Sequence, residues 1–181
     1  VGGQGVNNSW SSYTYENVLT QVSYQGNLHV GLGTTAGDAE VWRFHESTWT
    51  QIGGDNLNGG WNTGYEEVSA SAVLDNTLYV GLGNTAGDAE VYSWNGTTWT
   101  KIGGDNLYGG WNTGYERVTS MTAYKGQIYV GLGNSAGDAE LFTWNGSVWT
   151  RVGGDGINSS WANSVYEQID SMIVYKDLLM I

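Results

Sequence analysis

Residues 52–101 read IGGDNLNGGWNTGYEEVSASAVLDNTLYVGLGNTAGDAEVYSWNGTTWTK, and the rest of the chain repeats this segment. Residues 102–151 match it at 31 of 50 positions, residues 1–51 are a looser copy with one extra residue, and residues 152–181 are a shortened fourth copy. A period of about fifty residues is too long for a helical or leucine-rich unit and suits four antiparallel strands. The repeat therefore predicts one all-β domain, residues 1–181: a β-propeller with three full four-stranded blades and a partial fourth.

The composition agrees with an all-β class and excludes several functions. Glycine (29), tryptophan (10) and tyrosine (12) are abundant, and no stretch shows a helical period, so no helix is expected. A net charge of −12 with only six Lys and Arg argues against nucleic acid or an anionic membrane as a partner. The chain has no cysteine, which excludes disulfides and thiolate metal sites. No apolar run is long enough to cross a bilayer.

Each full repeat contains four short runs that read as strands. The first runs are 17–24, 68–74, 118–124 and 169–175; the second are 28–33, 78–83 and 128–133; the third are 39–44, 89–94 and 139–144; the fourth is 48–52 with its copies, each carrying a tryptophan, Trp49, Trp99 or Trp149. Small side chains in the first run suit an innermost strand, and the aromatic residues of the third suit the wider outer part of a blade.

The connections between these strands fall into two classes. Dipeptides such as Gln25-Gly26 and Asn95-Gly96 suit two-residue hairpins between strands one and two and between strands three and four. Strands two and three are joined by a longer loop, GLGTTAGDAE in the first copy, and strand four leads to the next copy through GGDNLNGGWNTGYE. Both long loops would lie at the same end of an up-and-down blade, which predicts one face that carries all of the elaborate loops.

A tryptophan recurs in the longest loop and is the first candidate for ligand binding. A flat aromatic ring among Asn, Asp and Gly suits sugar binding, because the ring stacks on a pyranose while amides and carboxylates bond its hydroxyls. The alternative is a structural role for the ring as a plug between blades. The candidate ligand-binding residues are Trp10, Trp61, Trp111, Trp161, Asp55, Asp105, Asp155, Asn62 and Asn112.

Two acidic residues, two positions apart, recur at the start of each third strand. Side chains so spaced share a face of the strand, and hard oxygen ligands placed in this way could hold Ca²⁺ together with loop carbonyls. The alternative is that each Asp closes its own loop through an Asx turn and each Glu accepts backbone N–H bonds. The candidate metal ligands are Asp38, Glu40, Asp88, Glu90, Asp138 and Glu140.

Few residues are unique to one repeat, as a catalytic constellation would require. His29 and His45 are replaced by Tyr or Asn in the other copies. His29 lies in the middle of a predicted strand and reads as a core histidine, whereas His45 reads as a solvated hairpin residue. With two His and no Cys, a transition-metal site is not expected, and the prediction is a protein that is not an enzyme.

The strand sequences GNLHVGLG (26–33), EVWRF (40–44) and TWTQIGG (48–54) resemble a kelch or galactose-oxidase-type propeller blade. Gly53, Gly54, Gly59, Gly60 and Trp61 also resemble the loop element of tachylectin-type lectin propellers. The second resemblance implies multivalent binding of aminosugars. The copper-radical chemistry of the galactose-oxidase group is contradicted by the missing cysteine.

The sequence thus predicts an extracellular or surface-exposed binding module that recognises a glycan or another cell-surface ligand through its loop-bearing face. A structural or adhesive repeat protein is the alternative, and a propeller domain of a larger enzyme is the third. The fourth copy contains only two of the four strands, so further blades or other copies of the chain are expected to cover the exposed end.

Overall fold

The computed structural model describes residues 1–10, 17–161 and 165–181. Each of the first three repeats folds as an antiparallel meander of four strands. The first meander contains β1 (Asn17–Tyr24), β2 (Asn27–Gly33), β3 (Val41–His45) and β4 (Thr48–Gly53); the second contains β5 (Glu67–Leu74), β6 (Thr77–Gly83), β7 (Val91–Trp94) and β8 (Trp99–Gly103); the third contains β9 (Arg117–Tyr124), β10 (Gln127–Gly133), β11 (Leu141–Trp144) and β12 (Trp149–Gly153). The fourth repeat contributes β13 (Ile173–Tyr175) and β14 (Leu178–Met180).

The three meanders are hydrogen-bonded into one open sheet, so the predicted β-propeller of separate blades is wrong. Twelve strands form this sheet, and its connected path runs β12-β11-β10-β9-β6-β5-β2-β3-β4. The links between meanders are the antiparallel pairs Gly33 with Glu67 and Gly83 with Arg117. Gly33 permits such a link, because a Cβ added there would lie 2.5 Å from the Cα of Glu67. The repeat length fixes four strands per unit but does not decide how the units join.

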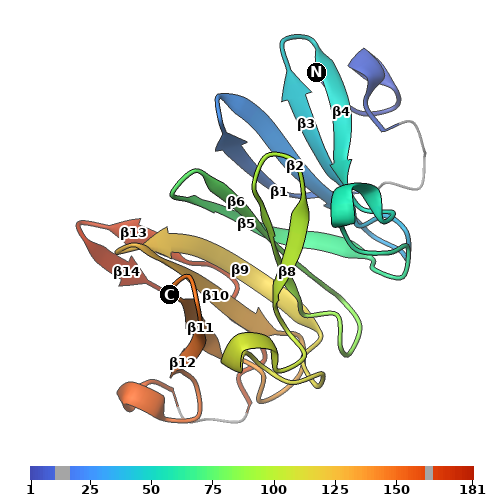
Figure 1. The fold of residues 1–181 in the computed structure, drawn as a ribbon. Helices are drawn as coiled ribbons and strands as arrows, with labels where there is room; N and C mark the ends of the chain where they lie inside the picture. Colours follow the sequence, from blue (N-terminus) through green and yellow to red (C-terminus); the bar gives the residue numbers. More distant parts are fainter. Residues whose placement is uncertain (11–16, 162–164) are drawn as a thin grey trace.

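Neighbouring meanders also stack against each other through their first strands. The hydroxyls of Thr20 in β1 and Ser71 in β5 lie 2.6 Å apart, and Ser69 Oγ donates to the Val118 carbonyl over 2.6 Å. Figure 1 shows the result as successive layers, from blue and cyan (β1–β4) through green (β5–β8) to yellow and orange (β9–β12), with the red β13–β14 hairpin beside β9.

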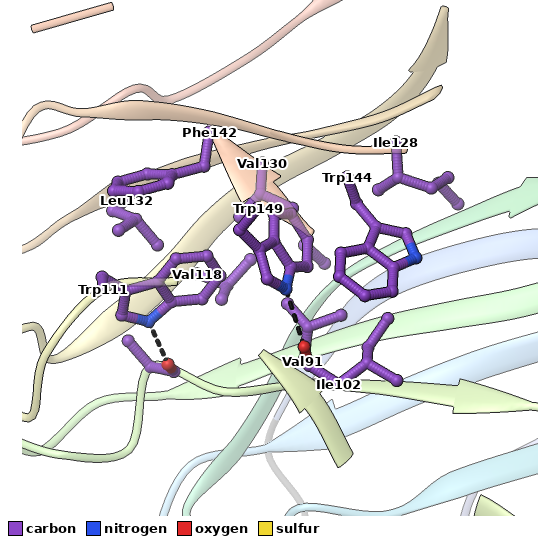
Figure 2. Packing of buried hydrophobic residues seen from close by; sticks show 13 residues of the cluster. Val91, Ile102, Trp111, Val118, Ile128, Val130, Leu132, Phe142, Trp144 and Trp149 are labelled. Carbon is purple, nitrogen blue, oxygen red and sulfur yellow. Dashed lines mark hydrogen bonds between the residues drawn. The ribbon is translucent and has the colours of Figure 1, made fainter. Parts of the chain in front are cut away.

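The core lies between these layers because each strand alternates its side chains between two covered faces. One cluster combines residues of the first and second meanders, including Val41, Leu78 and Trp99. The next combines the second and third meanders, including Val91, Ile128 and Trp149 (Figure 2). Each repeat therefore buries its apolar side chains mainly with the help of a neighbouring repeat.

The two kinds of predicted hairpin differ in the structure. At Gln25-Gly26 both residues have positive φ, 50° and 73°, as a two-residue turn requires. At Asn95-Gly96 the strands end earlier, at Trp94 and Trp99, and the Asn95 carboxamide oxygen accepts hydrogen bonds from the backbone N–H groups of Thr97 and Thr98, each over 2.9 Å. The prediction of a two-residue turn is therefore wrong at this position, because the asparagine side chain closes a longer one.

The expectation of no helix is wrong at four short turns. These are the three-residue 3₁₀ helices η1 (Val6–Asn8), η2 (Leu57–Gly59), η3 (Leu107–Gly109) and η4 (Ile157–Ser159), one in each repeat. Their middle residues are left-handed, as at Asn58 with φ 54° and ψ 32°, so no hydrophobic period marks them in the sequence. No helix within the described ranges is long and apolar enough to cross a membrane.

Candidate functional site

The two long loops of neighbouring repeats lie against each other. Gly37 N–H donates to the Tyr65 carbonyl over 3.0 Å, and Gly87 N–H donates to the Tyr115 carbonyl over the same distance. Loops 34–40, 84–90 and 134–140 therefore adjoin the ends of loops 54–66 and 104–116 and residues 165–168. We call this set of loops the loop edge. The predicted gathering of long loops on one side is thus present, although the sheet is open.

Two of the four loop tryptophans are buried, so the predicted exposure of their rings to a ligand is wrong. Trp61 and Trp111 are 2% and 3% exposed. Their indole N–H groups donate to the carbonyls of Ala39 and Ala89, which belong to the preceding repeat. Each ring packs edge-on against a fourth-strand tryptophan: the ring centroids of Trp61 and Trp99 lie 5.4 Å apart, and those of Trp111 and Trp149 lie 5.1 Å apart. Figure 2 shows the second pair. A ring held in this way cannot stack on a sugar. Trp61 and Trp111 therefore have the structural role that was the alternative to ligand binding.

The other two loop tryptophans are half-buried. Trp10 packs edge-on against Trp42 at 5.9 Å and Trp49 at 5.2 Å. Trp161 donates to the Ala139 carbonyl over 2.6 Å and lines an open cavity of about 390 Å³ at the end of the molecule. The four tryptophans are therefore equivalent in sequence but not in exposure, because only Trp61 and Trp111 have a four-stranded meander before and after them in the chain.

The predicted ligand-binding asparagines lie on the surface of the loop edge. Asn62 and Asn112 are exposed, and each uses its carboxamide oxygen to accept the backbone N–H two residues later, at Gly64 or Gly114, over 2.7 Å. This Asx turn is closed by the carboxamide oxygen, so the N–H₂ group of each exposed asparagine takes no part in closing it.

The predicted ligand-binding aspartates are exposed, and each lies four residues after a polar side chain that contacts it. Lys101 forms an ion pair with Asp105, and Arg151 forms one with Asp155 at 3.2 Å. In the first repeat Gln51 occupies this position and donates to Asp55 over 3.4 Å.

Two of the predicted metal ligands in the first repeat have other partners. Asp38 Oδ2 accepts hydrogen bonds from the backbone N–H and the hydroxyl of Thr35, over 3.2 and 2.9 Å, which is the loop-closing alternative. Glu40 is buried and accepts the Trp42 indole N–H over 2.6 Å. These contacts already use carboxylate oxygens that a calcium ion would need.

In the second and third repeats a basic side chain forms an ion pair with the buried glutamate among the predicted metal ligands. Lys101 is ion-paired with the buried Glu90, and Arg151 is ion-paired with the buried Glu140 at 2.5 Å. Burial raises the pKa of both Glu carboxyls, and the nearby cation opposes this shift. A side-chain ammonium or guanidinium is thus already paired with one of the two predicted metal ligands in each of these repeats.

A tyrosine hydrogen-bonds to each of these two buried glutamates. Burial is the largest cause of the raised pKa of Tyr65, followed by its hydrogen bond to Glu90; burial and a hydrogen bond to Glu140 likewise raise the pKa of Tyr115. Neither these tyrosines nor the cations Lys101 and Arg151 are among the site residues predicted from the sequence. Their recurrence at equivalent positions of the second and third repeats is the signal that could have identified them.

The remaining predicted metal ligands lie beside acidic residues of the neighbouring loop. Burial raises the pKa of Asp88 to about 6, and Glu66 contributes through its charge and a hydrogen bond. Burial and the charge of Glu116 raise the pKa of Asp138. Thr85 Oγ1 donates to Glu66 over 2.9 Å. Among the residues that the structure describes, no group of three or more His, Cys, Asp or Glu side chains is arranged to hold a metal ion.

The two histidines occupy different environments. His29 is 3% exposed, contacts the backbone carbonyl of Asn27 through Nδ1 at 3.2 Å, and packs edge-on against Tyr24. Burial is the main reason that its pKa is lowered to about 4. His45 is exposed, as predicted for a hairpin residue. The core interpretation of His29 therefore agrees with its surroundings.

Comparisons with known proteins give a structural likeness and no family. No family model matches the chain, and no curated protein matches it. A solved structure, described as the extracellular domain of the hybrid two-component system BT4673 from B. thetaiotaomicron, aligns with a TM-score of 0.51 at 17% sequence identity. The alignment covers 78% of this chain and 17% of that one, so the chain spans about a sixth of the length of its structural neighbour. At this identity the likeness concerns the all-β fold alone.

Proposed function

We propose that this chain is a non-catalytic binding module that acts outside the cell and recognises glycans through the loop edge. The observation that supports the proposal is the repeated Asn-Thr-Gly turn at residues 62–64 and 112–114. In both copies the turn is exposed and is closed by the same 2.7 Å hydrogen bond. Two equivalent polar sites on one rigid sheet suit a ligand that itself repeats.

The chemistry of these turns suits a ligand rich in hydroxyl groups. Each asparagine presents amide N–H donors, the next threonine is exposed, and the aspartates Asp55 and Asp105 present acceptor oxygens. Trp61 and Trp111 contribute by fixing the loop backbone from below through their bonds to the preceding repeat. Recognition at these two sites is therefore polar, without stacking on either ring.

The distribution of polar groups favours binding over catalysis. The acidic and tyrosine side chains of the loop edge recur in two repeats with similar partners, whereas catalysis normally uses one asymmetric set of groups. Of the singular residues, His29 is buried within the first meander and His45 lies on a distant hairpin. The extracellular location proposed here is supported by the description of the structural neighbour as an extracellular domain.

A glycan array tests the proposal. The wild-type chain is expected to bind a subset of the glycans, and Asn62→Asp with Asn112→Asp is expected to lose the signal. Aspartate keeps the oxygen that closes each turn but removes the N–H donors. Asn76→Asp, the same substitution at an exposed asparagine of the β5–β6 hairpin outside the loop edge, serves as the matched control. Absence of binding to any glycan by a folded wild-type chain, or full binding by the double variant, would contradict the proposal.

A further inference from the structure

The end of the molecule formed by the fourth repeat carries a large exposed apolar surface. Leu178 and Met180 of β14 are 61% and 50% exposed, and Ile173 and Tyr175 of β13 are 65% and 58% exposed. This surface continues into the cavity of about 390 Å³, whose lining includes Trp161, Ile169 and Ile181. Contiguous apolar surface of this kind usually marks a place where another polypeptide binds.

The other repeats show what covers the equivalent surface. Ile181 is equivalent to Val130 in the third repeat; Val130 is completely buried, whereas Ile181 is 54% exposed. The β10 strand that contains Val130 pairs on one side with β9 and on the other with β11. In contrast, β14 pairs with β13 alone within the described part of the chain. The outer edge of β14 can therefore accept an antiparallel strand.

The cavity corresponds to a place that aromatic rings fill in the other repeats. Trp111 packs against Phe142 of a third strand at 5.2 Å and Trp149 of a fourth strand at 5.1 Å, as Figure 2 shows. Trp61 packs in the same way against Tyr92 and Trp99. Trp161 makes the same bond to the preceding repeat as these two residues, but on its other side lies the cavity.

The backbone beside the cavity repeats the features that receive a fourth-strand tryptophan. At Gly103 an added Cβ would lie 3.1 Å from the indole of Trp149, so a larger residue would press on that ring. Gly153 is the equivalent residue beside Trp161, and there an added Cβ would meet Leu141 and Trp161 at 3.2 Å. The glycine is thus present at position 153 as well, although among the described residues no fourth-strand tryptophan packs on it.

A carbonyl group near the cavity completes the pattern. In the second repeat the Ile52 carbonyl accepts both the Asn58 amide and the Trp99 indole N–H, over 3.1 and 2.8 Å. The equivalent Val152 carbonyl accepts the Asn158 amide over 3.0 Å. A carbonyl oxygen has two lone pairs, so the Val152 oxygen can accept a further indole N–H from the side of the cavity.

We propose that this end of the molecule binds a two-stranded β-hairpin of the type formed by β11 and β12, with one aromatic ring from each strand in the cavity. The first strand of the hairpin pairs with β14. The tryptophan of its second strand packs on Gly153 and Trp161 and donates its indole N–H to the Val152 carbonyl. This binding would continue the interface that already joins successive repeats, in which Thr119 and Ser120 of the third repeat donate to the Ile169 carbonyl of the fourth.

A fusion tests the proposal directly. In the test variant a copy of residues 131–153 follows Ile181, and in the control the copies of Phe142 and Trp149 in this extension are replaced by alanine. Hydrogen exchange of β14 and acrylamide quenching of tryptophan fluorescence are measured in both. The proposal predicts slower exchange in β14 and stronger protection of Trp161 in the test variant alone. Equal behaviour of the two fusions, or an extension that leaves β14 unprotected, would overturn it.

A peptide that carries residues 139–153 tests the same surface in trans on the unmodified chain. We expect measurable binding by fluorescence anisotropy. Replacement of the peptide residue Trp149 by alanine should weaken the affinity by about tenfold or more, as for a central aromatic anchor. Gly153→Ala in the chain is expected to weaken binding while the circular dichroism spectrum stays unchanged. Absence of binding by the wild-type peptide would overturn the proposal. Chain dimers that the peptide cannot dissociate would also overturn it, because they would assign the surface to a second copy of the chain.

Discussion

At the scale of single residues, the fourth-strand tryptophans join each meander to the chain segment that precedes it: Val1, β4 or β8. The indole N–H groups of Trp49, Trp99 and Trp149 donate to the carbonyls of Val1, Ile52 and Ile102 over 2.9, 2.8 and 2.7 Å. All three rings are 2% exposed. A buried ring that also makes a hydrogen bond contributes to stability in two separable ways.

Substitution of Trp99 separates these two contributions. Trp99→Phe keeps most of the ring and loses the hydrogen bond, so we expect a loss of about 1 kcal/mol in the free energy of unfolding. Trp99→Ala leaves a cavity between two meanders and should cost about 3–5 kcal/mol. Urea denaturation measures both. Similar losses for the two variants would show that the hydrogen bond, and not the ring volume, holds the meanders together.

The buried His29 should make the protein sensitive to acid. Its pKa is about 4 in the folded state and 6.5 as the ordinary value, so the unfolded chain binds more protons between these values. Stability from this group is complete above pH 6.5 and is lost as the pH falls towards 4, by an amount on the order of 3 kcal/mol.

The variant His29→Tyr tests this expectation, because tyrosine occupies the equivalent positions 79 and 129. We expect the variant to lose less stability than the wild type between about pH 7 and pH 4.5 in urea titrations. An identical pH dependence of the two proteins would contradict the role of His29. The elevated pKa of Asp88 acts in the opposite direction, since a carboxyl with a raised pKa favours the folded state at lower pH.

At the scale of the elements, the ion pairs of Lys101 and Arg151 hold the third and fourth strands together at the loop edge. Lys101→Gln introduces the residue found in the first repeat and leaves the buried Glu90 without its cation. We expect a loss of about 3 kcal/mol near pH 7, as for other broken buried pairs. The loss should be smaller in acid, because burial already raises the pKa of Glu90 and protonation removes its unpaired charge.

The matched control is Lys101→Arg, which reproduces the third repeat. Arg151 contacts Glu140 and Asp155 in the same arrangement, so the control should remain close to the wild type in thermal unfolding. If glutamine and arginine at position 101 gave equal melting temperatures, the ion pair would contribute nothing to stability.

The same contacts give an expectation for calcium. Lys101 and Arg151 lie among the carboxylates of two repeats, and Asp38 closes its own loop in the first. We therefore expect millimolar Ca²⁺ to leave the melting temperature unchanged relative to the same concentration of Mg²⁺. A calcium-specific increase in melting temperature would restore the metal site that the sequence suggested.

At the scale of the whole molecule, each meander depends on its neighbours for burial. The second meander lies between the first and the third and shares a core with each, whereas β13 and β14 are largely exposed. Local stability should follow this order. Hydrogen exchange with mass spectrometry should give the slowest exchange in β5, β6 and β10 and the fastest in β13 and β14. Uniform exchange across the four repeats would contradict this gradient.

Much of the strand arrangement could be predicted from the sequence. The strand β1 has the predicted bounds 17–24, and β5, β6, β9 and β10 begin within one residue of their predicted positions. Alternating apolar residues and turn glycines are local signals, and they act within a few residues of each other. For the same reason, the gathering of the long loops on one side followed from strand order alone.

The sequence by itself determined the repeat, the all-β class, the four strands of each unit and the candidate polar loops. Only the tertiary structure decided that Trp61 and Trp111 are buried, that Lys101 and Arg151 neutralise the acidic side chains, and that the units join as one open sheet. Those outcomes depend on contacts between residues about ten to fifty positions apart, such as Lys101 with Glu90, Trp61 with Ala39 and Gly33 with Glu67. A local pattern can specify a strand or a turn, but whether a side chain faces solvent depends on which neighbouring repeat packs over it.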